Sequence, residues 1–267
     1  MQPSTFSVLH QHQTNSRNGI RFRIHWVPCT GSLFIYHHLF SRTSKCIAVM
    51  GAAEITLFVD VVSPFAYQAF HILRNDAAFR NVRKNYIPVF LGGLMKMTGN
   101  TAPIQIKNKD KWIIKERIRW AHAFNIPMAA DNPPNFPPNT LQVMRALCGI
   151  VDDQERLCAI LERLFHEFWV NHVQIAQPDV FVPIFKEVLG AEVAEKVLAE
   201  AATKGKATLT KNTDDAFATG AFGLPWMVCT NMNGETEGFW GVDHFGQVAQ
   251  FLDLLKPRNA AGWKLML

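Results

Sequence analysis

The pattern of apolar positions predicts a strand, a turn and a helix early in the chain. Residues 55–60 form a short apolar run, and apolar residues recur at near-helical spacing between Pro64 and Leu73. Serine is favoured at the cap of a helix and proline at its first position, so we expect this helix to begin at Ser63 and Pro64. Residues 85–90 are expected to form a second strand.

The middle of the chain has a helical pattern instead. Apolar residues recur every three or four positions from Leu157 to Trp169, which predicts a helix that packs in the core. Further helices are expected over residues 110–124, 139–149 and 179–203.

Strand character returns after Gly223. Residues 226–230 and 236–240 are separated by an asparagine-rich turn that contains Gly234, a pattern that predicts a hairpin. A last helix is expected over residues 243–255. The order is therefore βαβ, then helices, then ββα, which predicts an α/β fold whose two outer parts share one sheet.

The positive charge of the chain lies in its first 49 residues. They hold five basic residues and no acid, whereas the rest of the chain balances 22 basic against 22 acidic residues, taken from totals of 27 and 22. A neutral remainder removes the electrostatic case for nucleic-acid binding. No apolar run is long enough to suggest a membrane span.

The composition of residues 1–49 is typical of a mitochondrial transit peptide, since it combines scattered arginines with many Ser and Thr residues. The alternative is that the native protein starts at Met50 and that the leader is a non-native extension. A genuine leader predicts a mitochondrial protein, and the alternative predicts a cytoplasmic one. The chain ends in Leu-Met-Leu, so a peroxisomal signal is not evident.

The five cysteines are widely and irregularly spaced, without a CxxC pair. This pattern favours neither structural disulfides nor a metal site. Cys148 and Cys158 are expected to be buried as small apolar residues.

Two segments carry a family resemblance. FVDVVSPFAY at 58–67 and GAFGLPWMV at 220–228 resemble segments of kappa-class glutathione transferases and 2-hydroxychromene-2-carboxylate isomerases. The resemblance covers roughly residues 54–256. Three weaker matches occur in the same order as in the family. They are TGN at 98–100, NTLQVMRAL at 139–147 and FWGVDHF at 239–245.

The resemblance implies a DsbA-like fold, in which a thioredoxin-like sheet domain is interrupted by a large all-helical insertion. The implied thioredoxin-like domain consists of residues 50–92 and 206–260, and the helical insertion domain consists of residues 93–205. Residues 1–49 would precede both.

In this family a Ser-Pro pair takes the place of the redox cysteine of disulfide oxidoreductases, which makes Ser63 the expected catalytic residue. A free thiol has a pKa near 8.5, so glutathione is mostly neutral at pH 7, whereas the thiolate is the reactive species. A serine O–H can donate to sulfur, and a helix N-terminus adds positive potential. Lowering the thiol pKa by about two units requires about 2.7 kcal/mol. The alternative is that Ser63 is only a helix cap.

The resemblance implies that glutathione is the co-substrate, and no metal is expected, since the cysteines show no metal-ligand pattern. The implied glutathione-binding residues are Ser63, Pro64, Phe65, Asn100, Lys109, Leu224, Pro225, Val242 and Asp243.

Several of these assignments have alternatives. The Leu224 backbone is expected to pair with the cysteinyl part of glutathione, and the Leu224–Pro225 bond is cis in the family. Phe65 fits a core position equally well. Lys109 fits a solvated loop in which Lys107 or Lys111 could take its role.

The end of the implied site departs from the family. Asp243 could bind the γ-glutamyl amine or could cap the last helix. Val242 and His244 stand where the family has serine and arginine, so the affinity for the γ-glutamyl carboxylate is in question.

The leading interpretation is therefore a kappa-type glutathione transferase, with a role in detoxification, in which the thiolate attacks a hydrophobic electrophile or a peroxide. One alternative is a glutathione-dependent 2-hydroxychromene-2-carboxylate isomerase, and another is a noncatalytic glutathione-binding module. Disulfide exchange is disfavoured because no cysteine stands at Ser63. The resemblance also implies a homodimer.

Overall fold

The computed structural model describes residues 51–257 and 261–266. The leader of residues 1–49 lies outside these ranges, as do Cys29 and Cys46. No helix in the described ranges is both long and apolar enough to cross a membrane.

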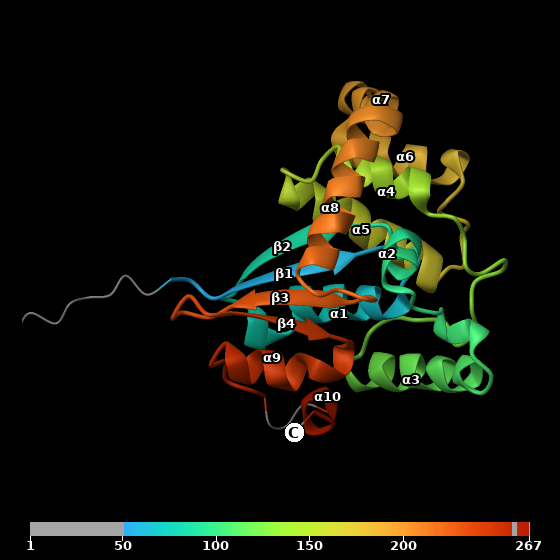
Figure 1. Cartoon of the computed structure of the whole chain (residues 1–267). Coiled ribbons are helices and arrows are strands. Elements are labelled where there is room, and N and C mark those ends of the chain that lie inside the picture. The colour runs from blue at the N-terminus through green and yellow to red at the C-terminus, as the bar shows by residue number, and fades with distance from the viewer. Residues whose placement is uncertain (1–50, 258–260, 267) are drawn as a thin grey trace, which may run out of the picture. The chain divides into compact units, whose positions relative to one another are not determined.

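A four-stranded mixed sheet forms the centre of the fold, in the order β2-β1-β3-β4 (Figure 1). Strand β1 pairs in parallel with β2 and antiparallel with β3, and β3 pairs antiparallel with β4. The strands are β1 (Glu54–Val59), β2 (Arg83–Pro88), β3 (Trp226–Thr230) and β4 (Thr236–Trp240). The βαβ and ββ parts thus share one sheet, which confirms the predicted α/β, DsbA-like arrangement.

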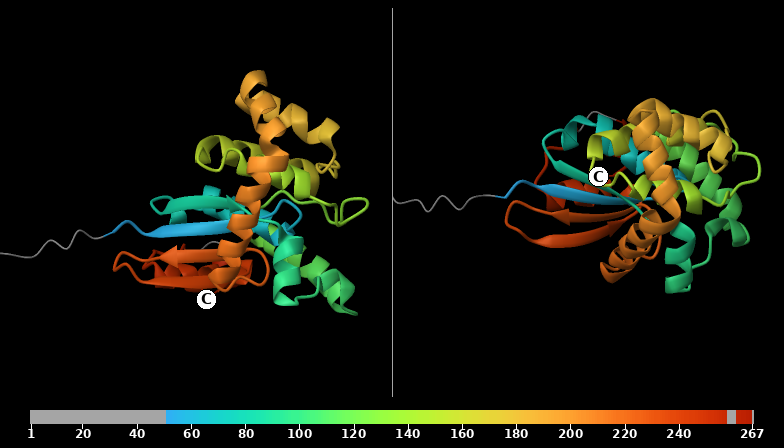
Figure 2. Two further views of the ribbon diagram at one scale, coloured as in Figure 1. Left: turned by 45° about the horizontal axis from the view of Figure 1, so that its top comes forward. Right: turned by 90° about the horizontal axis from the view of Figure 1, so that it is seen from above.

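Helices surround this sheet. Helices α4 to α7 gather on the side of β2, and α9 lies beside β4 (Figure 1). Helix α8 runs from beside α7 across the strands, as Figure 1 and Figure 2 show. The helices are α1 (Pro64–Asn75), α2 (Leu91–Thr98), α3 (Lys109–Ala123), α4 (Leu141–Cys148), α5 (Gln154–Trp169), α6 (Pro178–Leu189), α7 (Ala191–Glu200), α8 (Lys206–Ala218), α9 (Phe245–Phe251) and α10 (Ala261–Lys264).

Helices α1 and α5 join the sheet to the helical part. The Tyr67 ring of α1 stacks on the Phe165 ring of α5 at 5.2 Å between centroids, and Phe70 lies 5.5 Å from the same ring. All three side chains are buried. The predicted helical period of residues 157–169 therefore does place its apolar side in the core.

The structure corrects several predicted elements. The helix expected over residues 179–203 is two helices, because Gly190 adopts φ 81° and ψ 156° and ends α6. Helices α2 and α8 were not expected, since the glycines of α2 and the polar sequence of α8 obscure the helical period. The last helix is shorter than expected because a 3₁₀ turn, Val242–His244, precedes α9. The domain boundaries at residues 92 and 205 stay a prediction.

Gly205 provides a test of how the helical part packs. It lies in a π-helical turn, Ala201–Gly205, where an added Cβ would collide with the backbone carbonyl of Arg145 in α4. We expect Gly205→Ala to lower the free energy of unfolding by about 1–3 kcal/mol, because a backbone must shift to admit the methyl group. Urea denaturation measures this, and Lys206→Ala at the exposed neighbouring position is the control. Equal stability of the two variants would contradict the described packing.

Candidate functional site

The expected site residues gather at one end of the sheet, where β1 ends and β3 begins. Phe58 lies opposite Trp226 in the antiparallel register, so Asp60, two residues after Phe58, and Leu224, two residues before Trp226, lie at the same end of the two strands. The turn after Asp60 leads directly into α1, with Ser63 at its start. The segments that carry Ser63 and Leu224 are therefore neighbours in space although they are distant in sequence.

Ser63 caps α1, as the local sequence predicts. Its Oγ accepts a hydrogen bond from the Ala66 N–H at 3.2 Å, and its own N–H donates to the Asp60 carbonyl at 3.0 Å. The Ser63 O–H donates to no described protein group, and the Phe65 N–H at the same helix end has no acceptor. Capping therefore uses Ser63 as an acceptor only and leaves its proton available for another partner.

Leu224 offers its backbone rather than its side chain. The Leu224 side chain is buried, and the Leu224–Pro225 bond is cis, as the family resemblance implies. Among the described residues, neither the N–H nor the carbonyl of Leu224 makes a hydrogen bond. An extended ligand can use both groups in the way that an added strand would.

Asn100 is held against this segment. It follows α2, which ends at Gly99 in the left-handed conformation, and its Nδ2 donates to the Phe222 carbonyl at 2.8 Å. The Asn100 Nδ2 also lies close to the space beside Gly223. The structure thus brings Asn100 to the Leu224 segment, while its Oδ1 stays free to accept a hydrogen bond.

The segment after β4 reaches the same end of the sheet. The Gly241 N–H donates to the Pro225 carbonyl at 3.1 Å, and Val242 is buried directly after it. Asp243 makes no capping bond to α9, so the cap interpretation finds no support in the described contacts. The Asp243 carboxylate is exposed, and His244 Nδ1 lies 3.3 Å from it at ion-pair distance without hydrogen-bond geometry.

Lys109 and Phe65 are less clearly parts of the site. Lys109 is the first residue of α3 and is exposed, as are Lys107 and Lys111, and no hydrogen bond or ion pair joins its side chain to a described residue. Phe65 is half-buried against the core, which agrees with its alternative interpretation as a packing residue. The roles of both residues in ligand binding stay predictions.

Asp60 is a residue that the sequence reasoning missed. Its side chain is fully buried, and its carboxylate accepts three hydrogen bonds, from the Val62 N–H at 3.2 Å, the Leu91 N–H at 2.9 Å and the Thr140 hydroxyl at 2.8 Å. Burial raises the pKa of Asp60 to about 6, although the three hydrogen bonds oppose this shift. An acid at the end of an apolar strand, three residues before the serine, was the available signal.

Trp169 and Arg117 stabilise the turn of residues 60–63. The Trp169 indole N–H donates to the Val61 carbonyl at 3.1 Å, and the Arg117 guanidinium lies 5.2 Å from the Trp169 ring. Arg117 is buried, and burial lowers its pKa. The turn before Ser63 is therefore held at the Val61 carbonyl by Trp169 of α5, whose ring lies against Arg117 of α3.

The described cysteines are unsuited to redox chemistry. Cys148, Cys158 and Cys229 are free and buried, as expected for the first two. Burial raises the pKa of Cys148 and Cys229 to about 12 and that of Cys158 to about 11. Their thiols are thus essentially neutral at pH 7 and are poor nucleophiles.

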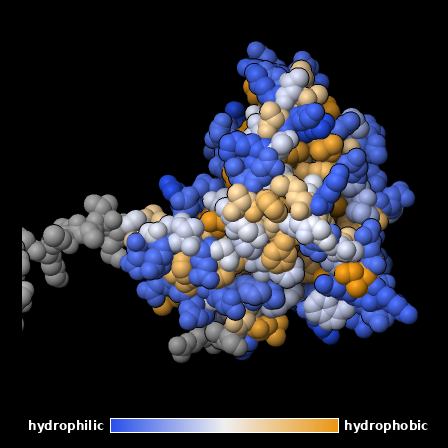
Figure 3. Space-filling view, in the orientation of Figure 1, coloured by the Kyte–Doolittle hydropathy of each residue, from blue (hydrophilic) through white to orange (hydrophobic). Residues whose placement is uncertain are grey.

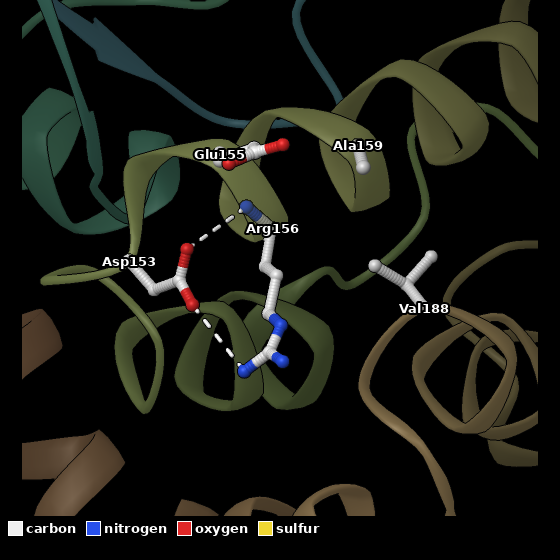
Figure 4. Close-up of a pocket in the computed structure, with 5 residues that line it drawn as sticks. All are labelled: Asp153, Glu155, Arg156, Ala159 and Val188. Carbon is white, nitrogen blue, oxygen red and sulfur yellow. Dashed lines mark hydrogen bonds and ion pairs between the residues drawn. The ribbon is translucent and has the colours of Figure 1, made fainter.

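A surface hollow lies away from this site. It is formed by α5 and α6, where Arg156 lies 3.4 Å from the Asp153 carboxylate and Val188 faces them (Figure 4). Both charged side chains are about half exposed, and Asp153 caps α5 through the Arg156 N–H at 3.1 Å. These contacts serve the helix start, and none of the expected site residues lines the hollow. No group of three or more potential metal ligands occurs in the described ranges.

Comparison with known proteins supports one family. The family model of the DSBA-like thioredoxin domain matches residues 54–253. Glutathione S-transferase kappa 1 of Caenorhabditis elegans is 26% identical over 212 residues, which cover 76% of this chain and 92% of that protein. Glutathione S-transferase kappa 1 of Rattus norvegicus is 28% identical over 213 residues, which cover 76% and 93%.

A similar fold occurs among solved structures. The structure of a 2-hydroxychromene-2-carboxylate isomerase matches with a TM-score of 0.63 at 18% identity, over 75% of this chain and 94% of that chain. This match supports the fold of the chain.

The buried Asp60 predicts a pH dependence of stability. Its pKa is about 6 in the folded chain against an ordinary value of 3.8, so the folded chain holds this proton more tightly than the unfolded chain. The stability from this proton is complete below about pH 4 and is lost as the pH rises to about 6, by about 3 kcal/mol. The variant Asp60→Asn has no ionisable group at this position, so this contribution to stability is absent from it. Urea denaturation should show the unfolding free energy of the wild type falling by this amount relative to the variant, and a difference independent of pH would contradict the assignment.

Proposed function

Since this chain belongs to the family of DSBA-like thioredoxin domains, we propose that it is a glutathione transferase of the kappa type. The observation that carries the proposal is the free Ser63 O–H at the start of α1, beside the unpaired backbone groups of Leu224. The kappa-type relatives, which align over three quarters of the chain, support the same activity.

Glutathione would bind as an additional short strand. The N–H and carbonyl of its cysteinyl residue would pair with the Leu224 backbone, which fixes the sulfur near Ser63. Asn100 would accept a hydrogen bond through its Oδ1, and Asp243 would bind the γ-glutamyl amine. Val242 offers no hydroxyl to the γ-glutamyl carboxylate, so this part of the ligand would be held less firmly.

The chain's contribution to the reaction would be to stabilise the thiolate. The Ser63 O–H donates to the sulfur, while the unpaired Phe65 N–H and the other dipoles at the start of α1 add positive potential. The thiol proton leaves to solvent, and the thiolate then attacks an electrophilic carbon, such as the halide-bearing carbon of an aryl halide. The carbon–sulfur bond forms, the carbon–halogen bond breaks, and the halide leaves to solvent with the bonding electron pair. No protein thiol is required, which fits the three buried cysteines.

An aromatic surface beside the site suits a hydrophobic electrophile. Phe222 and Trp240 are 41% and 40% exposed, their rings lie 5.0 Å apart, and the Trp240 ring lies next to Gly223. Trp226 lies 6.2 Å from Phe222 and supports this pair from within. Figure 3 shows apolar surface on the face where α8 crosses the sheet. A planar apolar substrate could stack there within reach of the thiolate.

The isomerase alternative would use the same thiolate for reversible addition. The two functions differ in their product, because transfer yields a glutathione adduct and isomerisation regenerates free glutathione. Incubation with an aryl halide and with a 2-hydroxychromene-2-carboxylate therefore separates them. Tight glutathione binding without turnover of either compound would favour a binding module.

Ser63→Ala tests the role of Ser63. Loss of one charge-assisted hydrogen bond, of about 1.5–3 kcal/mol, should raise the thiol pKa of bound glutathione by about one to two units. The ultraviolet absorbance of the thiolate measures this pKa, and turnover at pH 6.5 should fall about tenfold or more. Ser63→Thr should retain most of the effect. Asp153→Ala removes the cap of α5 instead and should leave the thiol pKa unchanged.

An unchanged thiol pKa in folded Ser63→Ala would overturn the assignment of Ser63. An absence of glutathione binding to the wild type would overturn the transferase proposal itself.

We propose that this chain is a mitochondrial protein with a role in detoxification. The arginine-rich, acid-free composition of residues 1–49 supports the proposal. A fluorescent protein that carries residues 1–49 should enter mitochondria, and replacing the arginines of the leader with glutamine should abolish import. Diffuse cytoplasmic fluorescence of the unaltered fusion would contradict the proposal.

A homodimer is proposed as well. Large apolar side chains are exposed along α2, α3 and the segment between them, and they are Met97, Ile106 and Trp112. A second copy of the chain could cover this surface.

A further inference from the structure

The turn before Ser63 is held by both the main chain and the side chain of Asp60. The Asp60 carbonyl accepts from the Ser63 N–H, and the Asp60 carboxylate accepts from the Val62 N–H. Both hydrogen bonds of the turn of residues 60–63 therefore end on Asp60. The direction in which Ser63 enters α1 therefore depends on where Asp60 is fixed.

Asp60 is in turn fixed by two distant helices. Leu91 is the first residue of α2, and its N–H donates to Asp60 because the residue before it, Phe90, has no side chain that can cap the helix. Thr140 precedes α4, and its hydroxyl donates to Asp60 instead of capping its own helix. One carboxylate thus satisfies donors from three segments that are separate in sequence.

Helix α2 links this carboxylate to a second residue of the candidate site. The helix runs from Leu91 to Thr98, and Gly99 then turns the chain so that Asn100 meets the Phe222 carbonyl. Ser63 therefore ends the turn that is bonded to Asp60, and Asn100 follows the helix α2 whose first N–H is bonded to the same carboxylate.

We propose that Asp60 is a positioning residue, which sets the placement of Ser63 and Asn100 relative to each other and so prepares the site for the thiolate. The inference rests on the proposed glutathione transferase function. Asp60 does not contact glutathione in this account, and it acts only through the turn of residues 60–63 and through α2.

Positioning and charge predict opposite effects of removing Asp60. A carboxylate near the thiolate disfavours it, so a purely electrostatic role predicts that Asp60→Asn lowers the thiol pKa of bound glutathione. A positioning role predicts that the pKa rises, because an amide has only one acceptor oxygen and its NH₂ group would face a backbone N–H or a hydroxyl.

Thr140→Val is the sharper variant because it removes one hydrogen bond to Asp60 and leaves the charge in place. Thr213→Val is its matched control, since Thr213 is also buried and its hydroxyl bonds to Phe90 and Leu209 but not to Asp60. Both variants replace a buried hydroxyl with a methyl group of nearly the same size.

The experiment measures the thiol pKa of glutathione bound to the full chain, together with amide hydrogen exchange of Val62, Ser63 and Leu91 in the ligand-free protein. We expect Thr140→Val and Asp60→Asn to raise the thiol pKa by about one unit, a tenfold loss of thiolate below that pKa. Exchange at the three amides should become faster, while core strands stay protected. Thr213→Val removes the acceptor of the Phe90 N–H beside Leu91, so it serves as the control at Val62 and Ser63 only. It should leave their exchange and the thiol pKa unchanged.

Two results would overturn the inference. One is an unchanged thiol pKa and unchanged exchange in folded Thr140→Val and Asp60→Asn, and the other is a thiol pKa that falls in Asp60→Asn. If wild-type protein binds no glutathione, the transferase proposal fails separately. Faster exchange of Val62 and Ser63 in Thr140→Val, but not in Thr213→Val, would still support the role of Asp60 in holding the turn.

Discussion

The antiparallel pairing of β1 with β3 is the constraint on which the candidate site depends. It places Phe58 opposite Trp226, so the turn that leaves β1 and the proline segment that enters β3 meet at one end of the sheet. Two further parts of the candidate site are hydrogen-bonded to the proline segment. The N–H of Gly241, directly after β4, donates a hydrogen bond to the Pro225 carbonyl, and the Asn100 side chain donates one to the Phe222 carbonyl. A shift in this register would separate the helix cap from the free backbone groups of Leu224.

The proposed chemistry depends on which hydrogen-bonding groups are paired within the protein and which are left available to a ligand. Ser63 accepts a bond as a helix cap and keeps its proton, and Leu224 keeps both of its backbone groups. Asp60 differs from these two residues, because its carboxylate already accepts three hydrogen bonds from the protein. The reactive sulfur would therefore come from the substrate, while the chain supplies donors at fixed positions. In the proposed function the chain therefore needs no cysteine at the start of α1, because the thiol belongs to glutathione.

The parts of this account that depend on neighbouring residues were predictable from the sequence. The strands, the hairpin and the cap at Ser63 follow from local patterns, and the structure places them within a few residues of expectation. Contacts between distant segments were not predictable in the same way. Nothing near Asp60 shows that Leu91 and Thr140 donate to it, and nothing near Asn100 points to Phe222. The family resemblance identified Asn100 and Leu224, but it did not show how they are held.

The most direct test of the central claim is an experimental structure of the full chain with glutathione bound. The account predicts that the glutathione sulfur lies within hydrogen-bond distance of Ser63 Oγ, and that the cysteinyl N–H and carbonyl pair with the backbone of Leu224. Glutathione bound elsewhere, such as in the hollow between α5 and α6, or with its sulfur directed away from Ser63, would contradict it.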